Sequence, residues 1–62
     1  MSLITPKLKH DFINNTLRLE VLNNLIAEAL DAKSEIPQIE LLDLIKFTQL
    51  HLELVNQINS ES

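Results

Sequence analysis

The sequence contains no cysteine and no glycine, and each absence excludes a class of structure. Without cysteine there are no disulfide bonds and no thiolate metal sites. Without glycine, the tight turns that join neighbouring β-strands lack the residue they most often need. A glycine-rich loop for nucleotide phosphates is excluded for the same reason, so this chain cannot phosphorylate itself from ATP. The composition therefore favours helices joined by a single connection.

Basic residues are also scarce, because five Lys and Arg stand against nine Asp and Glu, for a net charge of −4. Nucleic-acid binding depends on a basic surface that neutralises phosphates, so we expect no nucleic-acid partner. The apolar runs fall well short of the roughly 20 residues that a membrane span needs, and the N-terminus lacks the apolar segment of a signal peptide. We therefore expect a cytoplasmic protein that does not enter a membrane.

Two segments are free of residues that break helices, and each is preceded by a helix-start signal. Thr5 and Pro6 form the first signal, because a threonine side chain caps free backbone N–H groups and proline fits the first helical position. Ser34, as N-cap, and Pro37, in the first turn, form the second. The prediction is a single helical-hairpin domain over residues 1-62, with helix 1 at about 6-32 and helix 2 at about 37-59.

The apolar residues form two stripes along each predicted helix. The first stripe alternates three- and four-residue steps, as in a heptad seam. Its members are Leu8, Phe12, Asn15, Leu19, Leu22, Ile26 and Ala29 in helix 1, and Leu44, Phe47, His51, Leu54 and Ile58 in helix 2. The second stripe consists of Ile13, Leu17, Val21 and Leu25 in helix 1, and of Leu41, Ile45, Thr48, Leu52 and Val55 in helix 2.

Two adjacent stripes indicate a helix with two packed neighbours, as in a four-helix bundle. One chain supplies two helices, so the simplest assembly is a homodimer, although larger assemblies remain open. The predicted fold class is all-α, an antiparallel helical hairpin forming a homodimeric four-helix bundle. Asn15 and His51 interrupt the seams, where a polar residue helps to fix how helices pair.

The stretch "KHDFINNTL" near the start of helix 1 carries the residues best suited to chemistry. His10, Asp11 and Asn14 lie within about one helical turn, and residues four apart lie on the same face. A histidine on an amphipathic helix is most often a solvated or half-buried residue with no chemical role. The alternative is an imidazole nucleophile, which is effective near neutral pH.

The longer stretch "LKHDFINNTLRLEVLNNLI" resembles the phosphoacceptor region of dimerisation and histidine-phosphotransfer (DHp) domains of two-component signalling. The resemblance implies that His10 accepts the phosphoryl group, that Asp11 hydrogen-bonds the imidazole or takes its proton, and that Asn14 orients water for dephosphorylation. Lys7, Lys9 and Arg18 would offset the phosphoryl charge. Asn15 departs from the pattern, because many such domains have proline at this position.

The same resemblance implies a homodimer whose partner is a response-regulator receiver domain or a partner kinase. It implies no cofactor on this chain, with Mg²⁺ supplied by the receiver domain. A chain without an ATP-binding domain would be a phosphorelay or docking module, a degenerate kinase remnant, or a fragment of a longer protein. The alternative is a non-catalytic helical-hairpin adaptor, chaperone or inhibitor that dimerises and binds a partner protein, in which His10 is incidental.

Overall fold

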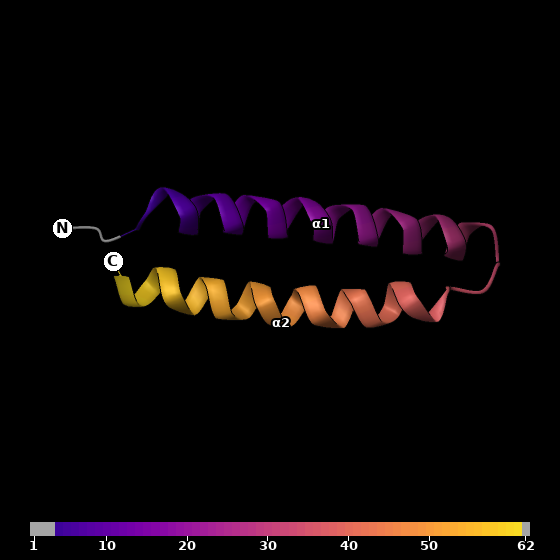
Figure 1. Cartoon of the computed structure of the whole chain (residues 1–62). Helices are drawn as coiled ribbons and strands as arrows, with labels where there is room; N and C mark the ends of the chain where they lie inside the picture. Colours follow the sequence, from indigo (N-terminus) through magenta and orange to yellow (C-terminus); the bar gives the residue numbers. More distant parts are fainter. Residues whose placement is uncertain (1–3, 62) are drawn as a thin grey trace.

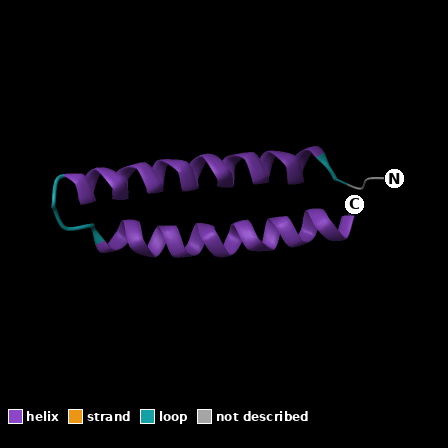
Figure 2. Cartoon of the chain, turned by 180° about the vertical axis from the view of Figure 1, so that it is seen from behind, coloured by secondary structure: helices purple, strands orange, loops and turns teal. Residues whose placement is uncertain are grey.

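The computed structural model describes residues 4–61, which form two α-helices lying side by side (Figure 1). Helix α1 spans Pro6–Asp31 and helix α2 spans Gln38–Glu61. The two helices run antiparallel in a rod of 49 × 14 × 14 Å, and the described residues include no strand (Figure 2). The predicted all-helical hairpin is confirmed.

Helix α1 begins as the sequence predicts. The Thr5 side-chain oxygen accepts a hydrogen bond from the Leu8 backbone N–H at 3.1 Å, and Pro6 occupies the first helical position. The first N–H groups of a helix have no acceptor within the helix, and the Thr5 side chain supplies an acceptor for one of them. The N-cap therefore fixes where the chain enters the hairpin.

Helix α1 ends in a left-handed turn that glycine usually makes. Lys33 has a φ of 54°, and its N–H donates to the Leu30 carbonyl at 3.1 Å. The Ser34 N–H donates to the Ala29 carbonyl at 3.0 Å, and the Ser34 hydroxyl donates to the same oxygen at 3.3 Å. The two backbone bonds form a Schellman motif, so the Ala29 and Leu30 carbonyls are satisfied without glycine.

The predicted role of Ser34 as the N-cap of helix 2 is wrong, because Ser34 closes α1 instead. Helix α2 begins after Pro37, whose carbonyl accepts from the N–H groups of Glu40 at 3.0 Å and Leu41 at 3.3 Å. A residue that precedes proline is pushed away from helical geometry. Ser34 and Ile36 therefore lie outside the helix, which begins at Gln38, one residue after the predicted start at about 37.

The first stripes of the two helices face each other. Leu8, Leu22 and Leu54 are buried, and Asn15 is the buried polar residue among those that the structure describes. The rest of the two seams is half-buried. The interhelical contact is therefore a single narrow seam.

The second stripes face outward. Ile13, Leu17, Val21 and Leu25 are all exposed, and so are Leu41, Ile45 and Leu52 on α2. Each i+4 step advances about 40° beyond a full turn, so a stripe with this spacing winds around its helix. In one hairpin, the first stripe of each helix thus lies in the interhelical seam, and most of the second stripe stays on the surface.

Candidate functional site

His10 lies near the N-terminal end of α1 with an exposed side chain. Its Nε2 atom is 3.0 Å from the Nδ2 atom of Asn14, one turn further along the helix. An amide NH₂ group only donates, so Nε2 accepts this bond and carries no proton. The neutral ring then bears its proton on Nδ1, and Asn14 holds the basic nitrogen of the imidazole in one orientation.

Asp11 is engaged elsewhere. Its Oδ2 atom lies 2.9 Å from the Nζ atom of Lys7, in an i, i+4 ion pair on the surface of α1. The resemblance to DHp domains implies a bond between Asp11 and the imidazole of His10, and the structure places this carboxylate on Lys7 instead. Surface pairs of this kind contribute only about 0.3–0.5 kcal/mol, so Asp11 can change partner at little cost.

Arg18 is directed toward α2 rather than toward His10. Its guanidinium carbon lies 5.6 Å from the centre of the Phe47 ring, and its NH2 nitrogen lies 4.0 Å from the Asp43 carboxylate. A guanidinium over an aromatic face is attracted by the negative charge of the ring. Arg18 therefore ties the two helices together, and Lys7 and Lys9 are the cations nearest His10 in the sequence.

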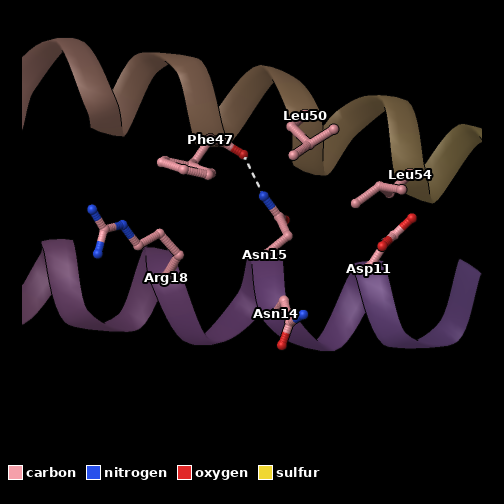
Figure 3. Close-up of a pocket in the computed structure, with 7 residues that line it drawn as sticks. All are labelled: Asp11, Asn14, Asn15, Arg18, Phe47, Leu50 and Leu54. Carbon is pink, nitrogen blue, oxygen red and sulfur yellow. Dashed lines mark hydrogen bonds between the residues drawn. The ribbon is translucent and has the colours of Figure 1, made fainter. Parts of the chain in front are cut away.

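A groove of about 400 Å³ runs between the helices beside this site. Its wall is formed by Asp11, Asn14, Asn15, Arg18, Phe47, Leu50 and Leu54 (Figure 3). Asp11 and Arg18 stand on either side of Asn15 along α1, and the α2 side is apolar. The groove thus has opposite charges on one wall and an apolar opposite wall.

Asn15, which lines the groove, belongs to a polar cluster with His51 and the Phe47 carbonyl. Asn15 is 3% exposed, and its Nδ2 atom donates to the Phe47 carbonyl at 2.9 Å. Its Oδ1 atom lies 3.0 Å from His51 Nδ1, which must therefore be the donor. The His51 ring also stacks at a tilt against Phe12, with 5.4 Å between the ring centres.

The sequence placed Asn15 and His51 in the seams but did not pair them with each other. Heptad spacing identifies the contact face of each helix and leaves open how far one helix is shifted along the other. The contact between Asn15 and His51 depends on that shift. The ion pair between Lys7 and Asp11, by contrast, could have been predicted from its four-residue spacing.

No protein-family model, curated protein or solved structure matches this chain. Among residues 4–61, no three His, Asp or Glu side chains are grouped so that they could hold a metal ion. Neither α1 nor α2 is long and apolar enough to cross a membrane. Any function must therefore be argued from His10, its neighbours and the surfaces around them.

Proposed function

We propose that the chain is a histidine-phosphotransfer or receiver-docking module of two-component signalling, with His10 as the phosphoacceptor. The observation that supports this proposal is an exposed imidazole whose Nε2 atom accepts a hydrogen bond from Asn14. Such a nitrogen keeps its lone pair, which a nucleophile needs. The proposed partner, a receiver domain or a kinase, would be met in the cytoplasm.

The proposed reaction is an in-line transfer from a phosphoaspartate of the receiver domain. The lone pair of His10 Nε2 forms the new N–P bond while the P–O bond to the aspartate breaks, and the aspartate carboxylate leaves with that electron pair. The imidazole proton on Nδ1 then passes to water, because His10 is exposed and the Asp11 carboxylate is paired with Lys7. The receiver domain supplies Mg²⁺, which neutralises the phosphoryl oxygens.

Asn14 has two roles in this proposal. Its amide holds Nε2 before the reaction and must move aside when phosphorus approaches, because the lone pair cannot serve both groups. The freed NH₂ group can then donate to a phosphoryl oxygen, and a neutral donor of this kind stabilises developing charge. Lys7, whose side chain is 85% exposed, can turn from Asp11 toward the same oxygens.

We further propose that two chains assemble into a homodimeric four-helix bundle. The support is the small hydrophobic core of a single hairpin. Among the residues that the structure describes, the buried apolar side chains are Leu8, Leu22 and Leu54. A domain of this size without disulfides usually gains stability by association. A dimer would present two copies of His10.

Phosphate transfer to His10 tests the proposal. The chain is incubated with a panel of receiver domains phosphorylated by acetyl phosphate, and acid-labile, base-stable phosphate on the chain is measured. We expect labelling of the wild type, loss of labelling in His10→Gln, and retention in His51→Asn, which alters the other histidine of the chain. Phos-tag electrophoresis separates the labelled and unlabelled chains.

The absence of label on the wild type, under conditions that label a known histidine-phosphotransfer domain, would refute the transfer reaction. Receiver binding that survives in the same assay would leave a docking module. Binding that is also unaffected by His10→Gln and Asn14→Ala would place the partner surface elsewhere on the hairpin.

A non-catalytic adaptor, chaperone or inhibitor is the second candidate function. The observation in its favour is the pairing of Asp11 with Lys7, because it leaves His10 without an acidic neighbour. In that case a partner helix would pack on exposed apolar residues such as Leu17 and Val21. A partner recovered by pull-down whose binding is lost in Leu17→Glu and kept in His10→Gln would favour this candidate.

A further inference from the structure

The groove shows which residues share a side of the hairpin. Asn14 and Leu50 each precede a seam residue by one position, and both line the groove. Successive residues on a helix project about 100° apart, so residues one position before and one position after the seam lie on opposite sides. The side with the groove is called here the groove flank, and the other side the second flank.

The groove flank carries more charged residues than the second flank, although the exposed Val21 and Leu25 also lie on it, each one position before a seam residue. Asp11 and Arg18 line the groove, and Asp43 is 4.0 Å from the Arg18 guanidinium on the same side. Packing another protein chain over these groups would remove ions from water, and the cost of desolvation often exceeds the attraction between the ions. The groove flank is therefore a poor site for a tightly packed apolar interface.

The second flank is apolar along the whole of α2. It is formed by residues next to the seam on the side away from the groove, namely Leu41, Ile45, Thr48, Leu52 and Val55. Leu52 is 62% exposed and Ile45 is 56% exposed, although both are large apolar side chains. By the same rule, helix α1 contributes to this flank Lys9, Ile13, Thr16, Glu20, Asn23, Ala27 and Leu30, of which Lys9 and Glu20 are charged.

The exposed area of the chain indicates how much surface remains to be covered. One hairpin exposes 4943 Å². A compact monomer of 7.1 kDa is expected to expose about 4,100 Å². The excess of roughly 850 Å² per chain is close to the about 800 Å² that each partner buries in a standard interface. An excess of this size is enough for one interface of the standard area that a stable dimer needs.

We propose that a second copy of this chain packs on the second flank, with Ile45 and Leu52 at the centre of the contact. The inference rests on the homodimer proposed above and specifies the face that it uses. Thr16, Asn23 and Thr48 would supply uncharged hydrogen-bonding groups within the contact. Asn14 lines the groove and lies on the same face of α1 as His10, so both histidines and both grooves stay on the outside of the bundle.

Charge substitutions on opposite sides of α2 test this assignment. Ile45→Glu and Leu52→Glu each place a carboxylate in the proposed contact of each copy. We expect either substitution to raise the dissociation constant of the dimer at least about tenfold. Leu42→Glu is the matched control, because Leu42 is 54% exposed, lies two residues before the seam residue Leu44 and thus projects away from α1. Leu42→Glu should change the dissociation constant of the dimer by less than about twofold. Sedimentation equilibrium gives the dissociation constants, and circular dichroism confirms that each variant is helical.

A distance measurement avoids reliance on disruptive variants. The chain has no cysteine, so Thr48→Cys and Leu42→Cys each carry a single nitroxide label. Pulsed dipolar spectroscopy of the full-length dimer should give a shorter distance between labels at Thr48→Cys than at Leu42→Cys.

The opposite order of distances would overturn the assignment of the second flank. The assignment would also be overturned by a dimer that is unaffected by Ile45→Glu and Leu52→Glu but dissociates with Leu17→Glu. That result would leave the proposal of a homodimer intact. A wild-type chain that remains monomeric at every accessible concentration would refute both the face and the homodimer. Phosphate transfer to His10 is measured independently of either result.

Discussion

At the scale of single residues, Asn15 is the side chain with the most structural consequence. One amide satisfies the Phe47 carbonyl and the Nδ1–H group of His51 at the same time. No side-chain nitrogen or oxygen that is buried within the described residues lacks a hydrogen-bond partner. A shift of one helix along the other would leave this amide buried and unpaired, which costs more than the bonds themselves contribute. Asn15 therefore specifies the register of the hairpin.

Replacing Asn15 by leucine should destabilise the chain by about 1–2 kcal/mol, because His51 then loses its partner in a half-buried position. Urea unfolding at a fixed protein concentration measures the change. Asn14→Leu is the matched control, since it is the neighbouring, exposed asparagine, and it should change stability by less than about 0.5 kcal/mol. A more stable Asn15→Leu variant would show that the polar cluster does not stabilise the fold.

At the scale of the elements, the end of α1 carries local strain. Lys33 adopts a left-handed backbone at φ 54°, where a side chain with a Cβ atom costs about 1 kcal/mol or more. The Schellman motif requires this geometry, and a chain without glycine cannot meet it with the usual residue. The hydrogen bonds of the Schellman motif therefore stabilise a left-handed backbone conformation that is unfavourable for Lys33.

Lys33→Gly should accordingly raise the free energy of unfolding, by about 0.5–1 kcal/mol after the greater freedom of glycine in the unfolded chain is subtracted. Ala32→Gly, one residue earlier, is the control. Ala32 has φ −80° and ψ −3°, which any residue adopts, so glycine there should lower stability. Thermal unfolding compares the pair, and equal shifts for both variants would argue against strain at Lys33.

At the scale of the whole molecule, the hairpin is a rod with one narrow seam and much exposed apolar surface. The helices bury little more than one stripe each, and the second stripes remain exposed. A protein this small approaches the limit at which a single core sustains a fold. Assembly and folding are therefore expected to be linked.

If two chains fold and associate together, apparent stability should increase with protein concentration. Each tenfold increase in concentration is expected to add about 1.4 kcal/mol to the apparent free energy of unfolding per dimer. Thermal or urea unfolding over a hundredfold range of concentration measures this dependence. An unfolding midpoint that does not move would indicate a hairpin that is stable alone, and the proposed bundle would lose its physical basis.

The parts of this structure that the sequence predicted correctly depend on local signals. The cap formed by Thr5 and Pro6 and the seams of both helices follow from residue types and spacing. The turn was misjudged because serine is a preferred N-cap residue, and without glycine nothing marked Lys33 as the left-handed residue. The bond between Asn15 and His51 could not be predicted, because it depends on how far one helix is shifted along the other. The sequence pattern of either helix alone does not determine that shift.

The chain topology has one further consequence for the end of the hairpin that carries His10. Only residues 32–37 join the helices, whereas the Asn15 bonds span 32 and 36 residues of chain. Closing a longer loop costs more entropy, so pairing is expected to begin at the turn and to reach Asn15 late. His10 lies beyond that point, on the part of the hairpin whose pairing is expected to form last. A partner would thus meet His10 on the part of the hairpin that pairs last, beyond the bond between Asn15 and His51.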